Sequence, residues 1–410
     1  MYSRNLPRLV CAVSIMTLAG VAVQAQPQNN IYEESLRAFI KEIDTTYPFF
    51  DLKGIRNDWK VSKRKLLARV KQCNSNDDFY GLLDQARRCL RDSHMQFRDL
   101  KGEYPRSEVR YFPGISFLPA VKNQVVIMSC MPEYSDGLKP GTIVTAIDGQ
   151  DARKYLEREA KKSWQAGGYF SSPQRARLYV YRIPLQGDEN EAHQLKVIKN
   201  GQGKTVRVVN KWKAGGWPHT YAMLQGLKRR GNCRFGRLKS GYGYIHLRRI
   251  RGELVPAVDE ALRSFKGIRG LIIDLRGNGG GGYSREVFDR FDKNKKPSGA
   301  HPYYRGNMVV LIDAGTISAG ETFARDLVNT AGAYLIGSAT AGSSSAKRSW
   351  LLPGGLGKVI LSRRSRWGFN RRPIEHNGIV PHRKAEVIPA ELQQGINSGI
   401  KRAEEYLNNR

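Results

Sequence analysis

The chain has 410 residues, more than one compact core usually accommodates, so two or three domains are expected. Its hydrophobic share of 40% is that of a folded soluble protein. Lys and Arg number 68 against 37 Asp and Glu, and the resulting charge of +31 would attract nucleic acid, anionic lipid or acidic envelope polymers without indicating any reaction.

The N-terminal residues have the pattern of a secretory signal. Arg4 and Arg8 precede the apolar run 9–23, and a small-residue cleavage pattern ends at Ala25. A membrane anchor is the alternative, but spanning a bilayer takes about 20 apolar residues, and this run is shorter and interrupted by polar residues. We therefore expect residues 1–25 to be a signal peptide cleaved after Ala25, leaving a periplasmic or secreted chain without a transmembrane anchor.

Cysteine spacing gives no metal site. With Cys11 removed in the signal, the mature chain keeps Cys73, Cys89, Cys130 and Cys233. An oxidising compartment permits disulfides among them and leaves their pairing open. None shows zinc-ligand spacing, and no metal or cofactor is expected.

Residues 26–100 have the periodicity of amphipathic helices. The apolar residues that share a helical face are Leu36, Phe39, Ile40 and Ile43 in one segment and Phe79, Leu82, Leu83, Ala86 and Leu90 in a later one. This pattern predicts a small N-terminal helical cap domain.

Residues 101–190 alternate strand-like stretches, such as Gln124–Met128, with turn residues. The segment 138–149 combines a Pro-Gly turn, a short apolar strand and an Asp-Gly turn. This order is typical of a PDZ domain, in which a sheet edge and a neighbouring helix receive an extended peptide, although any small β-hairpin also fits the local pattern. We expect an inserted PDZ-like β domain here.

Residues 191–410 alternate strands with helices, after a hairpin around Asn200-Gly201. The expected strands are 241–247, 270–275 and 308–312, and the expected helices are 254–265 and 318–330. Nearly continuous apolar strands separated by helices indicate an α/β core with a parallel or mixed sheet. Ligands of such sheets bind beyond the carboxyl ends of the strands.

The first loop at that edge follows the strand Leu271–Ile273 and is rich in glycine. Its sequence is Asp274-Leu275-Arg276-Gly277-Asn278-Gly279-Gly280-Gly281-Gly282. So many glycines let backbone N–H groups approach a ligand closely, which suits an oxyanion hole or an anion nest. A phosphate loop is the rival interpretation, but its Gly-Lys-Ser/Thr ending is missing, and a flexible turn is the third.

The second loop, residues 313–321, places Ser318 between a strand and a helix. The free N–H groups and the dipole of that helix would favour negative charge on an attacked carbonyl. Helix capping is the competing role, because Ser is a preferred N-cap. A nucleophilic serine also needs a base. Spacing does not choose among the seven histidines, although His94 lies at a domain border where it would face a cleft.

Four segments, taken in order, match a known family. They are GYGYIHL, FKGIRGLIIDLRGNGGGG, MVVLIDAGTISAGETF and YLIGSATAGSS. Over about Gly241 to Pro381 the chain resembles the core of the C-terminal processing and tricorn-type serine peptidases. The helical cap is similar to that of the tricorn-like, interphotoreceptor-retinoid-binding-like branch. The resemblance implies a ClpP/crotonase-like α/β core and a tail-specific serine endopeptidase that uses no cofactor.

The family has two catalytic arrangements, and the segment after Thr340 distinguishes them. In the Ser-Lys arrangement a lysine follows the glycine of the T-x-G segment. Here Ser343 follows Gly342, and Lys347 lies four residues further on as a displaced candidate base. Because proton transfer requires hydrogen-bond reach, the sequence favours the other arrangement, a Ser-His-Ser-Glu tetrad.

By resemblance, Ser318 is the nucleophile, His94 the general base, Ser93 the hydroxyl that helps to orient the imidazole, and Glu375 the distal acid. This is the logic of a catalytic triad with a hydroxyl interposed. The sequence departs from the family at His382, where the ending G-I-x-P-D has Asp, and this departure concerns the contacts of that turn.

The resemblance assigns the oxyanion hole to a backbone N–H of the glycine loop, at either Gly280 or Gly281, together with that of Ala319.

The expected substrates are unfolded or C-terminal segments of proteins. The alternative is a catalytically inactive protein that binds a peptide or an apolar ligand on the same scaffold. A third hypothesis is that the positive charge of the chain binds anionic envelope polymers. No motif predicts a specific nucleic-acid partner. Arg364, Arg366 and Arg371 precede Glu375 and predict a preference for acidic substrate ends.

Overall fold

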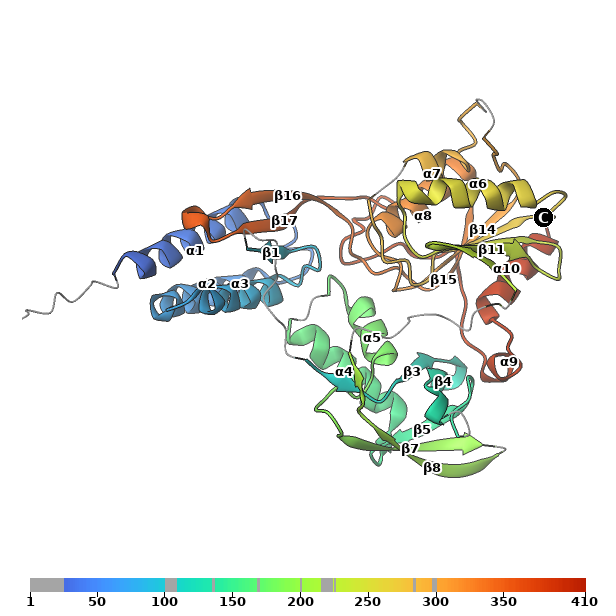
Figure 1. Cartoon of the computed structure of the whole chain (residues 1–410), viewed down its shortest axis with the longest axis horizontal. Helices are drawn as coiled ribbons and strands as arrows, with labels where there is room; N and C mark the ends of the chain where they lie inside the picture. The colour runs from blue at the N-terminus through green and yellow to red at the C-terminus, as the bar shows by residue number, and fades with distance from the viewer. Residues whose placement is uncertain are drawn as a thin grey trace, which may run out of the picture.

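The computed structural model describes residues 26–99, 109–134, 137–167, 170–199, 201–214, 224, 226–282, 285–296 and 301–410. The predicted signal peptide and its cleavage site after Ala25 lie outside these residues. The described part is a mixed α/β structure with several sheets, arranged as three units in an elongated molecule (Figure 1).

Three helices form the N-terminal unit, namely α1 (Gln26–Thr46), α2 (Arg56–Arg69) and α3 (Asn76–Leu90). The apolar stripes predicted from the sequence are buried between them, and Leu36, Ile43 and Phe79 are fully excluded from solvent. α3 begins at a capping box, in which the side chains of Ser75 and Asp78 each accept from the other's backbone N–H. The predicted amphipathic helices are therefore confirmed.

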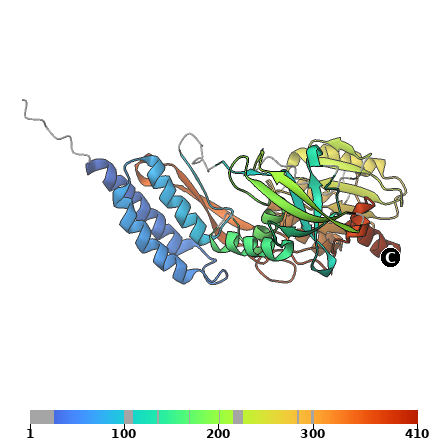
Figure 2. The same ribbon diagram turned by 90° about the horizontal axis from the view of Figure 1, so that it is seen from below.

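A hairpin from the C-terminal half of the chain lies against these helices (Figures 1 and 2). Its strands are β16 (Ser345–Leu351) and β17 (Lys358–Ser365), and its buried residues Leu352, Val359 and Leu361 share a core with α1 and α3. β17 also pairs with β1 (Gln96–Arg98), where Phe97 lies opposite Val359. Strand pairing therefore fixes the segment that follows Ser93 and His94 against this hairpin.

The middle unit is built on one antiparallel sheet. Its strands run in the order β3 (Ile115–Pro119), β4 (Val125–Cys130), β5 (Ile143–Ile147), β7 (Ala192–Lys199) and β8 (Gln202–Val209), with β6 (Gln150–Asp151) paired to β5. The helices α4 (Ala152–Gln165) and α5 (Pro173–Arg182) complete the unit, and β2 (Tyr111–Phe112) pairs with β9 (Trp212–Lys213). The sheet continues past residue 190, the expected end of this unit, because Leu195 and Val197 of β7 pack into the same core as Val144.

The third unit contains a mixed seven-stranded sheet. The strand order is β10 (Lys228–Arg230), β11 (Cys233–Arg237), β12 (Gly243–Leu247), β13 (Leu271–Asp274), β14 (Met308–Ile312), β15 (Tyr334–Gly337) and β18 (Arg383–Lys384). The strands from β12 to β18 are parallel, whereas β10, β11 and β12 pair antiparallel. The α/β core and the strands predicted for it are therefore confirmed.

Helices cover both faces of this sheet (Figure 1). On one face lie α6 (Val255–Ser264), α7 (Arg285–Asp289) and α8 (Ala319–Ala331), and on the other α10 (Ser398–Asn408), preceded by α9 (Pro389–Gln393). Side chains of alternate strand residues face opposite sides, so Ile273 and Val310 pack against the first group while Ile272 and Val309 pack against α10. The loops that follow β13 and β14 are consequently left at one edge of the sheet.

Candidate active site

Ser318 lies at the turn between β14 and α8, and its backbone is strained. Its φ of 57° and ψ of −117° place it where residues with a side chain are rarely found. An ordinary N-cap has β-region dihedrals, so capping does not account for this conformation. A sharp, strained strand-to-helix turn is instead how α/β hydrolases expose a nucleophilic serine.

The buried carboxyl of Glu321 holds the Ser318 turn against the segment 340–343. Its Oε2 accepts from Ser318 N and Ser343 N, both at 3.0 Å, and its Oε1 accepts from Gly342 N at 2.8 Å and Thr340 Oγ1 at 2.6 Å. Ser318 N also donates to Ser343 O at 2.9 Å. Burial raises the pKa of Glu321 to about 7, although these donors oppose the rise. Ser318 and Ser343 are therefore fixed side by side.

The glycine loop after β13 approaches Ser318 so closely that a side chain would not fit. A Cβ on Gly280 would lie 2.9 Å from the Ser318 Cβ, and one on Gly281 would lie 2.6 Å from Ile250 O. Both glycines have positive φ, 73° and 140°. The loop thus needs glycine here for space as well as for backbone conformation.

The backbone donors near Ser318 are not equivalent. Gly280 N donates to Asn278 Oδ1 at 2.9 Å. Within the described ranges, the N–H groups of Gly281 and Ala319 make no hydrogen bond, and Ala319 is the first residue of α8. Of the two glycines left open by the sequence, Gly281 is therefore the one whose N–H group is available to a ligand.

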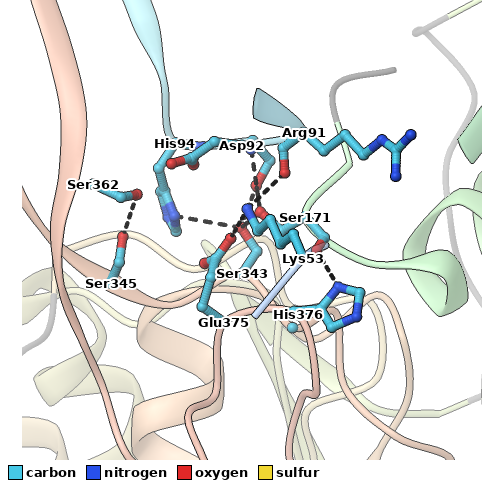
Figure 3. Close-up of polar contacts among 12 residues, drawn as sticks. Lys53, Arg91, Asp92, His94, Ser171, Ser343, Ser345, Ser362, Glu375 and His376 are labelled. Carbon is cyan, nitrogen blue, oxygen red and sulfur yellow. Dashed lines mark hydrogen bonds and ion pairs between the residues drawn. The ribbon is translucent and has the colours of Figure 1, made fainter. Parts of the chain in front are cut away.

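His94 enters from the helical unit, in the turn between α3 and β1, and is 6% exposed. Its Nδ1 lies 3.4 Å from Ser343 Oγ (Figure 3), and its backbone N donates to Asp92 Oδ1 at 2.9 Å. Burial, followed by the charge of Lys347, lowers the pKa of His94 to about 4. The imidazole is thus uncharged at neutral pH, as a general base must be. No hydrogen bond joins it to Ser318 Oγ in the part of the chain that the structure describes.

Three serine hydroxyls cluster beside His94. Ser93 Oγ is hydrogen-bonded to Ser343 Oγ and lies 3.1 Å from Ser171 Oγ. Ser171 precedes α5, and its Oγ lies 3.4 Å from Ser343 Oγ. A hydrogen bond from Ser171 also favours the ionised form of Glu375. Hydroxyl groups from three distant segments therefore lie between His94 and Glu375.

Glu375 is paired with a lysine from the helical unit. Lys53 Nζ donates to Glu375 Oε1 at 2.8 Å and to Arg91 O at 2.7 Å (Figure 3). It also donates to Tyr47 Oη at 3.0 Å, and the side chains of Lys53 and Glu375 are both 0% exposed. Burial raises the pKa of Glu375 to about 7, and Lys53 is the strongest opposing influence. Asp92 raises it further. Lys53 therefore stabilises the ionised form of Glu375.

The structure thus brings Ser93, His94 and Glu375 into one buried cluster, with Ser318 and the glycine loop adjoining it across Ser343. Sequence reasoning missed Lys53, Ser171 and the position of Ser343. The sequence contained a signal for Ser343 only, because it occupies the position of the lysine in the Ser-Lys arrangement.

His382, the departure from the family pattern, makes specific contacts of its own. Its Nδ1 accepts from Leu335 N at 2.9 Å, and its ring stacks between Tyr334 and Phe369. Burial lowers its pKa, which favours the neutral ring that can accept this hydrogen bond. The turn is therefore held by an imidazole in this chain.

Across the ranges that the structure describes, no His, Cys, Asp or Glu residues are grouped to hold a metal ion, and no helix is long and apolar enough to cross a membrane. The four cysteines in these ranges are free thiols, at Cys73, Cys89, Cys130 and Cys233.

Serine hydrolases are known to expose a nucleophilic serine on a strained turn between a strand and a helix, which is the position that Ser318 occupies. Residues 241–296 and 282–385 match the model of peptidase family S41. This match lies within the α/β unit, and it confirms the resemblance of that unit to the C-terminal processing and tricorn-type peptidases.

Solved structures share this fold over nearly the whole chain. Mature CPAF has a TM-score of 0.64 at 12% sequence identity, and the match covers 92% of this chain and 96% of CPAF. Mature CPAF in complex with lactacystin has a TM-score of 0.62 at 12% sequence identity, and that match covers 93% of this chain and 99% of CPAF. A protein from Parabacteroides merdae described as a peptidase has 0.53 at 16%, covering 92% and 96%. No curated protein sequence matches this chain.

Proposed function

We propose that this chain is a serine endopeptidase in which Ser318 is the nucleophile, His94 the general base, and Ser93 and Glu375 the groups that orient the imidazole. The backbone conformation of Ser318 carries the proposal, because helix capping does not require it. Further support comes from His94, whose neutral ring contacts Ser343, the residue fixed beside Ser318.

In the first step, His94 takes the proton of Ser318 Oγ as that oxygen bonds to the carbonyl carbon of the scissile peptide. The N–H groups of Gly281 and Ala319, which have no other acceptor among the described residues, receive the oxyanion. His94 then protonates the leaving amine, an acyl ester remains on Ser318, and water hydrolyses the ester with His94 again acting as base.

Of the charges around His94, that of Asp92 favours the imidazolium, whereas those of Lys347 and Lys53 oppose it. Lys53 favours the ionised form of Glu375, and a carboxylate there would orient the hydroxyls of Ser171, Ser93 and Ser343 that lead to His94. Hydroxyls oriented by a carboxylate can present their oxygen atoms to an N–H group. Protonated His94 Nδ1 would therefore find an acceptor in Ser343 Oγ.

The proposed substrates are unfolded or C-terminal protein segments, received by the middle unit in the manner of a PDZ domain. A cavity of about 500 Å³ between the middle and α/β units offers room for such a segment, and Asp313 and Ala314 of the loop that carries Ser318 line it. Its lining includes Leu118, Leu178, Tyr181, Ala314, Ser338 and Val380. The N-terminal signal pattern extends the proposal to a periplasmic or secreted location.

One observation favours the second candidate, a protein that binds peptides without turnover. Ser318 Oγ and His94 are not hydrogen-bonded to each other in the described part of the chain. In free enzymes, however, catalytic hydrogen bonds are often long and tighten only when substrate is bound.

Hydrolysis of a broad peptide library by the purified chain separates the two candidates. Wild type and Ser264→Ala, which changes a serine on α6, should give the same cleavage products by mass spectrometry, and Ser318→Ala should give none. Identical products from Ser318→Ala, or peptide binding by wild type without any cleavage, would reject the peptidase.

A further inference from the structure

A short basic segment leads into the proposed site, and we call residues 363–372 the arginine segment. Its five arginines are Arg363, Arg364, Arg366, Arg371 and Arg372. All five are exposed, and none forms an ion pair with any residue that the structure describes. Trp367 within the segment is 54% exposed. The segment therefore offers unneutralised charge and an apolar ring to solvent together.

The arginine segment adjoins the buried cluster. Residues 366–374 form a loop closed by the hydrogen bond from Ile374 N to Arg366 O at 2.7 Å, and Glu375 follows directly. On β17, Arg364 pairs with Ala346, three residues after Ser343, whose Oγ lies 3.4 Å from His94 Nδ1. The arginines at the start of the segment thus lie at the rim of the site.

The distance to Ser318 follows from α8. Arg325 Nη1 on this helix donates to Trp367 O at 3.2 Å. Arg325 is seven residues after Ser318, so at about 1.5 Å per residue the two lie about 10 Å apart along the helix axis. An extended peptide advances about 3.3 Å per residue, so this distance corresponds to about three substrate residues, and the reach of the long arginine side chains extends the range to about five.

We infer that the arginine segment binds an acidic stretch of the substrate, about three to five residues from the scissile bond on one side. This inference rests on the proposed peptidase function and adds the substrate class. Guanidinium groups pair with carboxylates in a bidentate manner, and the exposed Trp367 ring packs against the aliphatic parts of a peptide. A polypeptide is favoured over nucleic acid because the segment borders the proposed reaction centre.

The test compares two peptides that share one neutral cleavage sequence and carry either Glu or Gln at the third to fifth positions, placed in turn on each side of the bond. The variant replaces Arg364, Arg366 and Arg372 by Gln. Arg371 is left unchanged because its φ of 58° makes its substitution a risk to the turn.

A control variant removes the same charge elsewhere, by Arg229→Gln, Lys239→Gln and Lys266→Gln, which change exposed residues at or near β10, β11 and α6. At low salt, wild type and control should cleave the Glu peptide about tenfold faster in kcat/KM than the Gln peptide, since complementary charge raises association rates by about 10 to 10³. The arginine variant should lose this preference and keep its rate on the Gln peptide. Added salt should also remove the preference, because the Debye length falls from about 30 Å at 0.01 M to about 8 Å at 0.15 M.

Equal rates on the two peptides in wild type, or a preference that survives in the arginine variant, would overturn the inference. If wild type cleaves neither peptide, the peptidase proposal fails, and fluorescence anisotropy of the labelled Glu peptide then decides the inference. Binding that is lost only in the arginine variant supports the surface. Absence of binding, or arginine-dependent binding of a DNA oligonucleotide but not of the peptide, refutes it.

Discussion

Replacement of Lys53 by Met isolates the contribution of the helical unit to the proposed chemistry. Lys53 Nζ lies 2.8 Å from Glu375 Oε1, and both side chains are fully buried. Met keeps the apolar stem and removes the charge. Breaking a buried ion pair on one side typically costs about 3–5 kcal/mol of unfolding free energy. Glu375 escapes part of this cost by taking up a proton, because burial already raises its pKa to about 7.

The effect on activity follows from the charge on Glu375. At an effective dielectric constant of about 20, unit charges about 4 Å apart attract by about 4 kcal/mol. Since about 1.4 kcal/mol corresponds to one pKa unit, removal of Lys53 should move the titration of Glu375 upward by about one to three pH units. Ionised Glu375 supports the imidazolium, so activity should rise with pH through this titration. The acid limb of kcat/KM in Lys53→Met should therefore shift to higher pH by the same amount.

The assay is the pH profile of kcat/KM on a neutral peptide, measured for folded protein verified by circular dichroism. Lys53→Arg keeps the charge and should retain the wild-type limb even if its maximal rate falls. Lys63→Met removes a partly exposed ion pair with Asp44 in the same unit and should leave the profile unchanged. A wild-type limb in folded Lys53→Met would refute the reasoning.

The other predictions concern the glycine loop, the hydroxyl cluster and the buried carboxyl beside Ser318. Gly281→Ala should lower kcat by about 10²–10³, because it displaces a donor of the oxyanion hole. Gly279→Ala is the control, because its Cβ would meet only a flexible arginine side chain, and it should change steady-state rates little. Equal effects of the two substitutions would contradict the assignment of Gly281. Ser343→Ala should lower kcat by up to about tenfold at unchanged KM, as expected for one neutral hydrogen bond, and an unaltered kcat would remove Ser343 from the relay. Glu321 has a raised pKa, so its contribution to stability is complete below its ordinary pKa and is lost as pH rises through about 7. Glu321→Gln should therefore show a smaller fall in unfolding free energy than wild type from acidic to alkaline pH in denaturant titrations, and parallel pH dependences would contradict this.

Local patterns predicted the elements that carry Ser318. The strand 308–312 is continuously apolar because both faces of the sheet are covered by helices, and such a run is visible in sequence. The helix after Ser318 likewise has its own periodicity. Its N-cap role was also visible, but the positive φ of Ser318 was not, because strain is imposed by packing against Gly280 and Glu321 rather than by residue type.

Local sequence patterns could not predict which distant segments pair with each other. The pairing of Gln96 with Ile360 joins segments more than half the chain apart, and it places the His94 turn at the α/β unit. Lys53 lies in the segment Asp51-Leu52-Lys53-Gly54, whose composition is that of an exposed turn. Its burial depends on Glu375, which arrives from the other end of the chain, so no local signal could reveal it.

Covalent labelling tests the central claim most directly. A fluorophosphonate reacts with an activated serine, and the labelled peptide can be mapped by mass spectrometry. The account predicts that Ser318 is modified in wild type and in Lys347→Ala, which removes the displaced lysine candidate, but not in His94→Ala. Labelling that persists in His94→Ala, or that is lost in Lys347→Ala, would contradict a histidine-based site, and absence of label at Ser318 in wild type would contradict a nucleophilic serine.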